Sequence, residues 1–151
     1  MLKRIFGFAT MLATLLPPAA SAAPGLLAAS VRSGADLFAH ARFGSTRTYQ
    51  PLDGFDHRAL TCASCHAHGG IGPGRTVSGK PLPTLVGAAA RFPKVIGGKV
   101  YTLDHMITHC VEGMGGFPPE YDSPEMADLV TYLTALSKGA PLATTLPDPT
   151  H

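Results

Sequence analysis

Two cysteines and a histidine form the most chemically specific pattern in this sequence. Cys62 and Cys65 are separated by Ala63 and Ser64 and are followed directly by His66. The spacing Cys-x-x-Cys-His is the pattern for covalent attachment of a c-type haem. Two thiols at this spacing can reach the two vinyl groups of one porphyrin, and the adjacent histidine then lies beneath the iron. We therefore predict one covalent haem c, attached at Cys62 and Cys65, with His66 as the proximal iron ligand.

Two other kinds of site use closely spaced cysteines. A thioredoxin-like redox pair needs a βαβ setting and makes no use of the histidine, and a zinc knuckle needs a second ligand pair at zinc spacing. The sequence has one such motif and, with Cys110, three cysteines. Exported proteins stabilised by disulfides normally carry an even number. Haem attachment is therefore the favoured interpretation.

A helix that carries further candidate ligands is expected between residues 102 and 113. Thr102 is a suitable N-cap, and Gly113 is a suitable residue to follow the last turn. At about 100° per residue, one face of this helix collects its apolar side chains together with the third cysteine. The members of this face are Leu103, Met106, Ile107 and Cys110. We expect this face to pack inward, toward the haem.

The second axial ligand of the iron is sought among Cys110, Met114 and His109. His109 falls on the opposite side of the helix together with His105, so both are interpreted as solvent-facing, with at most a weak surface metal site between them. Met114 follows the helix in a glycine-rich segment, where a class I cytochrome c carries its methionine. The residues alone leave Cys110 and Met114 as alternatives.

Two more helices are expected to position these groups. Ser33 is a plausible N-cap for a helix over residues 34–43, which Gly44 would stop. Ser123 precedes Pro124, a preferred first helical residue, and this helix is expected to continue to Gly139. Met126 and Tyr132 are interpreted as core residues of the latter helix. Residues 44–60 form a polar insertion, and the Gly- and Pro-rich segment from residue 68 to 93 is expected to be irregular and to wrap the haem.

The first 22 residues are expected to direct export. Lys3 and Arg4 precede an apolar stretch, and a small-residue cleavage site follows the prolines, as in a secretory signal peptide. The apolar stretch is shorter than the roughly 20 residues that span a bilayer. Cleavage between Ala22 and Ala23 would place the mature protein in the periplasm, with ten basic and ten acidic residues. We expect no membrane span after cleavage.

Residues 58–139 resemble the haem domains of the SoxA sulfur-oxidation cytochromes and of the thiosulfate dehydrogenases. The motifs that carry the resemblance are Leu60–His66, Pro83–Gly87, Arg91–Pro93, Val100–Leu103, Ile107, Cys110, Gly113–Gly116, Asp122–Met126 and the helix with Tyr132-Leu133. The resemblance implies an all-α, cytochrome c-like fold of about three to five helices around one covalent haem, with long Gly/Pro-rich loops. We place this domain at residues 30–139, followed by a flexible tail at residues 140–151.

The resemblance also assigns the distal iron ligand. The cysteine that matches Cys110 is the distal ligand in that family, which gives His/Cys coordination. A thiolate lowers the reduction potential relative to a thioether, because its negative charge stabilises the ferric iron. Two features depart from the family. The sequence has a single Cys-x-x-Cys-His motif, and Met106 stands where the family has an arginine that holds an anionic sulfur substrate.

These features predict a periplasmic monohaem electron carrier linked to sulfur-compound oxidation, with other cytochromes or an oxidoreductase as redox partners. The alternative is a catalytic haem subunit of a thiosulfate-oxidising enzyme that works with a partner cytochrome. A formal net charge of +2 gives no case for nucleic-acid binding. Six cations lie between Asp56 and Asp104 with no acid among them: Arg58, Arg75, Lys80, Arg91, Lys94 and Lys99. They either steer an acidic partner or an anion, or are solvated and pair with the haem propionates.

Overall fold

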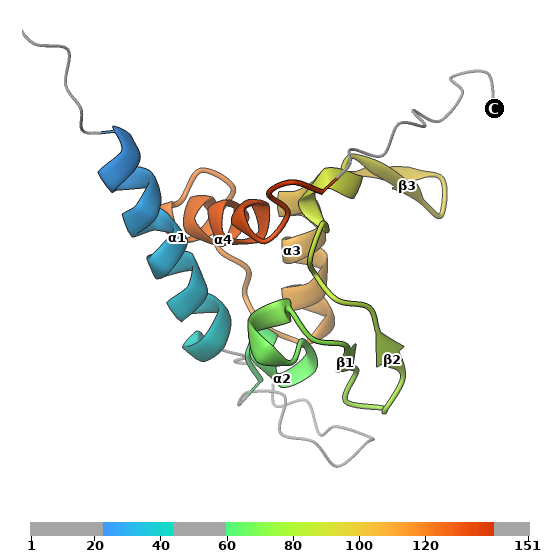
Figure 1. Ribbon diagram of the computed structural model, residues 1–151. Helices are drawn as coiled ribbons and strands as arrows, with labels where there is room; N and C mark the ends of the chain where they lie inside the picture. Colours follow the sequence, from blue (N-terminus) through green and yellow to red (C-terminus); the bar gives the residue numbers. More distant parts are fainter. Residues whose placement is uncertain (1–22, 44–59, 141–151) are drawn as a thin grey trace, which may run out of the picture.

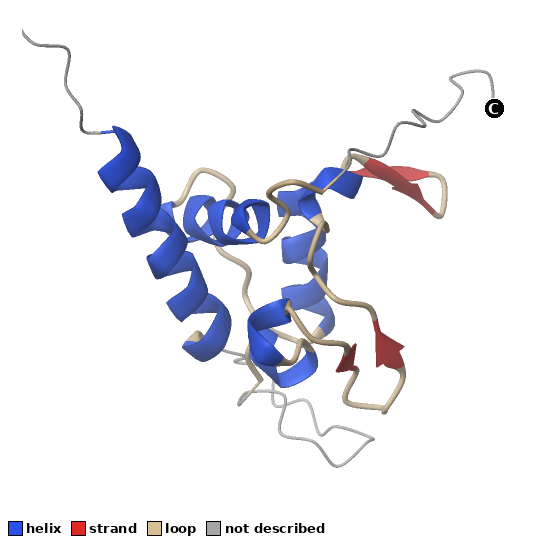
Figure 2. Cartoon of the chain, in the orientation of Figure 1, coloured by secondary structure: helices blue, strands red, loops and turns tan. Residues whose placement is uncertain are grey.

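The computed structural model describes residues 23–43 and 60–140, and most of their regular structure is helical. Within these residues there are four α-helices and two short 3-10 helices (Figures 1 and 2). The α-helices are α1 (Ala23–His40), α2 (Cys62–Cys65), α3 (Leu103–Gly113) and α4 (Pro124–Ala135), and the 3-10 helices are η2 (His68–Gly70) and η3 (Ala89–Arg91). Long connections between them confirm the expected loop-rich, all-α architecture.

Helices α1 and α4 cross closely and form the core of the fold (Figure 1). The crossing point is Gly34, where a Cβ atom would lie 2.0 Å from the backbone oxygen of Asp128, so only glycine fits. Beside it, the Phe38 ring packs 5.5 Å from the Tyr132 ring. Met126 is 1% exposed, which confirms it as a core residue, whereas Tyr132 is partly buried. The remaining buried members of the cluster are Ile107, Leu129 and Leu133.

The starts of α3 and α4 are where local sequence signals predicted them. Thr102 and Ser123 are the N-cap residues, and the Ser123 hydroxyl accepts a hydrogen bond from the Met126 backbone N–H at 3.2 Å. Helix α4 ends at Ala135, earlier than predicted, because turns occupy residues 136–139. Gly113 is the last residue of α3 rather than the residue that follows it.

The first helix was predicted wrongly at both ends. It spans Ala23–His40 rather than residues 34–43, and Ser33 lies inside it. The physical reason is the Leu-Leu-Ala-Ala run at residues 26–29, since these are among the strongest helix formers and they carry the helix through Ser33 without a cap there. Pro24, near the helix start, is tolerated in the first turn.

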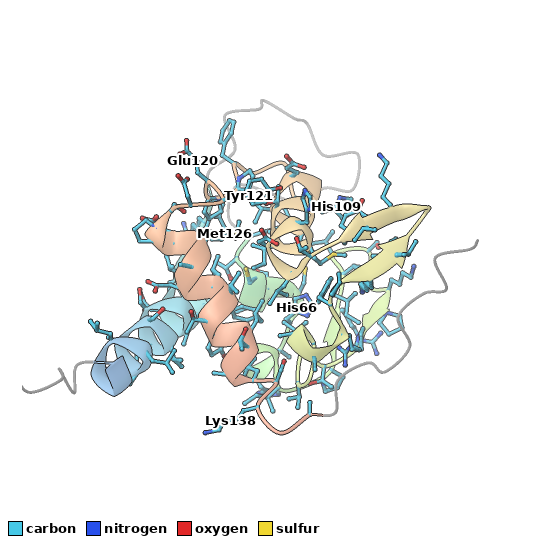
Figure 3. The ribbon with its side chains drawn as sticks, turned by 90° about the horizontal axis from the view of Figure 1, so that it is seen from above. His66, His109, Glu120, Tyr121, Met126 and Lys138 are labelled. Carbon is cyan, nitrogen blue, oxygen red and sulfur yellow. The ribbon has the colours of Figure 1, made fainter. Side chains whose placement is uncertain are left out.

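Two small antiparallel hairpins complete the described structure. Strand β1 (Gly74–Arg75) pairs with β2 (Pro81–Leu82), and β3 (Lys94–Ile96) pairs with β4 (Lys99–Tyr101). The second hairpin was not expected from the sequence. It turns at Gly97-Gly98, whose φ angles of 57° and 75° suit a tight hairpin turn between β-branched residues. In Figures 1 and 3, both hairpins lie on the side of the molecule away from α1.

Several sequence-based predictions fall outside the described residues. They are the export signal at residues 1–22, most of the polar insertion (residues 44–59) and all but the first residue of the C-terminal tail (residues 141–151). The domain limits of 30 and 139 therefore stay a prediction. Among the described residues, no helix combines the length and the hydropathy needed to cross a bilayer.

Candidate functional site

Helix α2 carries the two thiols of the Cys-x-x-Cys-His motif on a single turn. The Thr61 backbone N–H donates to the Ser64 hydroxyl at 3.0 Å, which fixes the start of this turn. Cys62 and Cys65 are three residues apart and therefore lie on neighbouring positions of one helix face. The His66 backbone N–H donates to the Cys62 carbonyl at 3.0 Å and closes the turn. Both thiols are free.

The His66 imidazole is held in the form that binds iron. Burial lowers its pKa, so the ring is neutral at physiological pH and keeps a lone pair for a metal. Its ring lies 6.3 Å from the Phe38 ring, between centroids. Its Nδ1 atom is buried and has no hydrogen-bond partner among the described residues. Such an orphaned imidazole beside two free thiols fits a covalently attached haem, whose iron would take one ring nitrogen.

The segment after the motif passes close over it and is tied down from two directions. At Gly74, a Cβ atom would lie 2.0 Å from the Cys65 carbonyl oxygen, so the chain can approach only without a side chain. The Tyr132 hydroxyl of α4 donates to the Gly69 carbonyl at 2.7 Å. The Leu85 backbone N–H donates to the Gly70 carbonyl, also at 2.7 Å. These positioning contacts were missed at the sequence level, because they join segments that are far apart in the chain.

Helix α3 brings the third thiol toward the first two. Burial, together with charge on the Cys110 and Cys65 thiols, raises the pKa of the Cys62 thiol to about 11. Burial also raises the pKa of Cys110, as does Cys65, while the Lys94 ammonium lowers it. Cys62, Cys65 and Cys110 therefore lie within electrostatic range of one another, and His66 directly follows Cys65 in the chain.

The side of α3 that packs into the protein core is centred on Ile107 and Val111. The most buried residue of the helix is Val111, 1% exposed, followed by Ile107. Leu103 and Met106 are only partly buried. Cys110 is exposed as a residue, although neighbouring parts of the chain partly desolvate its thiol. The helix thus packs into the core through Ile107 and Val111, which are four residues apart and lie on one face of the helix. Cys110 lies at the edge of that face, on the side toward the motif thiols.

The two other ligand candidates occupy different places. Met114 is the C-cap residue of α3, one turn beyond Cys110 and partly buried, so it lies on the same side of the helix. His109 is exposed, as is His105, and both rings pack edge-on against the Tyr101 ring, at 5.7 Å and 6.2 Å. Figure 3 shows His109 beside α3, toward the β3–β4 hairpin. No group of three or more His, Cys, Asp or Glu side chains in the described residues is placed to hold a bare metal ion.

Comparisons with known proteins agree with this arrangement. A family model described as the SoxA/TsdA cytochrome c domain matches residues 53–142. A search of curated proteins found no match. Among solved structures, the "as isolated" form of thiosulfate dehydrogenase (TsdBA) from Marichromatium purpuratum is similar, with 26% sequence identity and a TM-score of 0.54. That match covers 91% of this chain and 27% of the thiosulfate dehydrogenase chain. The expected cytochrome c-like fold is thereby confirmed, and the family implies covalently bound haem c.

Proposed function

The chain belongs to the SoxA/TsdA cytochrome c domain family, and from this premise we propose that it is a periplasmic monohaem c-type cytochrome that transfers single electrons in sulfur-compound oxidation. The observation that carries the proposal is the pair of free thiols on one turn of helix α2, followed directly by a histidine whose Nδ1 atom is buried without a hydrogen-bond partner. Bound haem c supplies the one-electron chemistry of its iron. The sequence has one Cys-x-x-Cys-His motif, which supports a single haem.

Each of these residues has a defined part in the proposal. Cys62 and Cys65 form the two thioether bonds, and His66 is the proximal ligand. Cys110 is the distal ligand, with Met114 as the alternative, since both lie on one side of α3. A thiolate at Cys110 would hold the potential low, because its charge favours the ferric state. The Lys94 ammonium, which lowers the pKa of Cys110, would partly offset that effect.

A catalytic role is the second candidate. It is favoured by the similarity to thiosulfate dehydrogenase and by Lys94, a cation within electrostatic reach of Cys110. Against it stands Met106, which is partly buried on α3. A thioether has no N–H or O–H group to donate to an oxyanion. In this candidate the chain would oxidise a sulfur compound and pass the electrons to a partner cytochrome.

The two candidates are separated by a steady-state assay with thiosulfate as the electron donor and ferricyanide as the acceptor. An electron carrier should show no turnover above that of a Cys110→Ala variant. Turnover well above this control would establish the catalytic candidate. An absorption spectrum of the purified protein tests the shared premise, since a c-type haem must remain on the chain after denaturation.

The periplasmic location rests on the N-terminal sequence pattern. The expected mature chain starts at Ala23, and α1 begins at this residue. N-terminal sequencing or intact mass measurement of the protein from the periplasm checks this, and an uncleaved chain in the cytoplasm would contradict it.

A further inference from the structure

The hairpin of residues 94–101, called the arm below, carries features that the haem site does not use. Resting on the electron-transfer function proposed above, we propose that the arm is the docking surface for a redox partner protein with an acidic surface. Three features of the arm support this role: the charge around it, its exposed apolar face and its connection to the helix that carries Cys110.

The charge of the described residues is segregated. From Thr61 to Leu103 the chain has no Asp or Glu. Its five cations in this segment are all exposed: Arg75, Lys80, Arg91, Lys94 and Lys99. They lie on or beside the two hairpins and η3, and Figures 1 and 3 place both hairpins on the side away from α1. This side of the molecule therefore attracts anionic surfaces over about a Debye length, roughly 10 Å at 0.1 M salt.

One face of the arm is apolar and uncovered. The strand register pairs Val95 with Val100, so their side chains share a face. They are 49% and 64% exposed. By the same register, the opposite face carries Lys94, Ile96, Lys99 and Tyr101, and the Tyr101 ring contacts α3. A two-stranded hairpin gains little stability from solvent-exposed valines, so this pair is better explained by a contact that the described residues do not supply.

The arm is connected to the candidate haem site. The Tyr101 ring packs against His105 and His109 of α3, the helix that carries Cys110. Only Thr102 separates the end of β4 from the start of α3. A protein seated on the arm would therefore lie close to the distal side of the haem, where electron transfer needs it.

The combination of charge and apolar surface favours a protein over a small anion. A sulfur oxyanion would be attracted by the cations but would gain nothing from the valine pair. Protein interfaces join an apolar centre to a charged rim, and complementary charge mainly raises the association rate. The chemistry on the arm therefore calls for acidic side chains around an apolar patch.

The test uses the haem-loaded protein and reduced flavodoxin, an acidic flavoprotein, as the probe. One electron leaves the reduced flavin and is taken up by the ferric iron, followed in an anaerobic stopped-flow instrument. At low ionic strength we expect Lys99→Glu to lower the second-order rate constant about fivefold and Val100→Ser about threefold. The Lys99→Glu deficit should disappear at about 0.5 M salt, where charges are screened within a few ångströms. Lys99 is chosen rather than Lys94, because replacing Lys94 would also change the electrostatics at Cys110, the proposed distal ligand.

Matched controls lie on α1, on the other side of the molecule. Arg32→Glu makes the same change of charge, and Leu26→Ser removes an equally exposed apolar side chain. Both should leave the rate constant within about 1.5-fold of the parent. Reduction by dithionite, a small reagent, should differ less than twofold among all variants. Calorimetric titration with oxidised flavodoxin measures complex formation without any electron transfer.

The possible results distinguish a failure of the docking proposal from a failure of the electron-transfer function on which it rests. If neither reductant reduces the parent protein, the electron-transfer function fails, and the titration alone then decides whether the arm binds acidic protein. The docking proposal is wrong if the arm variants and the α1 controls lower the rate constant with flavodoxin equally. It is also wrong if reduction by dithionite slows in the arm variants to the same extent. Two other occupants would also overturn it. One is a second copy of the chain, shown by a dimer that Val100→Ser dissociates. The other is anionic phosphatidylglycerol vesicles that bind the parent but not Lys99→Glu, while the flavodoxin rate is unchanged.

Discussion

The two halves of the described fold are stabilised in different ways. In the helical half, α1, α3 and α4 bury large apolar side chains against one another, with Phe38, Met126 and Val111 at most 2% exposed. From Thr61 to Tyr101 the buried residues are three glycines and Ala88. That half is held by individual hydrogen bonds such as the one from Tyr132 to Gly69. The helical half therefore has its own core, whereas the loop half buries almost no large apolar side chain, and we expect the haem proposed at Cys62 and Cys65 to supply its apolar contacts.

The largest expected effect comes from removing that attachment. Replacing Cys62 and Cys65 with alanine together should leave little folded protein in the periplasm, because binding of the group and folding of the loop half are coupled. Circular dichroism and the yield of soluble protein measure this. A double variant with the parent's spectrum and melting transition would contradict the dependence of the loop half on its cofactor.

The identity of the distal ligand gives the next largest effect. Cys110→Ala should abolish the low-spin thiolate signature in electron paramagnetic resonance and raise the reduction potential, because the ligand's negative charge is lost. Met114→Ala should leave the ferric spectrum nearly unchanged, and the parent should lack the red-edge absorption band of methionine-ligated ferric haem. The reverse pattern, with the sixth ligand lost only in Met114→Ala, would make this an ordinary methionine-ligated site.

A third prediction concerns the helical half alone. Gly34→Ala places a Cβ atom against the Asp128 backbone and should destabilise the fold by about 3 kcal/mol. The matched control is Gly25→Ala in the same helix, where nothing lies within 4 Å of the new atom, and a gain of about 0.5 kcal/mol is expected. Thermal unfolding of both haem-loaded variants checks the difference. Equal stabilities would show that the α1–α4 crossing is looser than described.

The smallest effect is expected where the two halves meet. Tyr132→Phe keeps the ring packed on Phe38 but removes the hydrogen bond to Gly69, at a cost of about 1 kcal/mol. Tyr121→Phe, at an exposed tyrosine, should change stability by less than about 0.5 kcal/mol. Urea unfolding measures both. If the two variants lose the same stability, the Tyr132 hydroxyl does not join the halves energetically.

Local signals in the sequence predicted what is determined locally. Thr102 and Ser123 occupy the N-cap positions of α3 and α4, where the Ser123 side chain makes a capping hydrogen bond and that of Thr102 does not, and the Cys-x-x-Cys-His spacing placed the two thiols on one turn. The same reasoning overvalued Ser33, because a cap residue does not stop a helix that strong helix formers precede. The β3–β4 hairpin had a readable signal, β-branched residues on both sides of Gly97-Gly98.

What could not be predicted depends on contacts between distant segments. The burial of Val111, the most buried residue of α3, is set by the surface against which the helix packs. The approach of Lys94 to Cys110 needs the hairpin, which was not expected. The convergence of Cys110 with the motif thiols was expected from a resemblance, and the helix period alone left Met114 open.

The Tyr132–Gly69 contact also has a consequence for the order in which the fold can close. The two residues are 63 positions apart in the chain, so a chain that emerges N-terminus first presents Cys62 and Cys65 before the tyrosine that holds the following loop. Under the proposed export, this order would apply as the chain enters the periplasm, where the thiols would at first have no α4 beside them. The loop after the motif would then be the last part to close over the thiols.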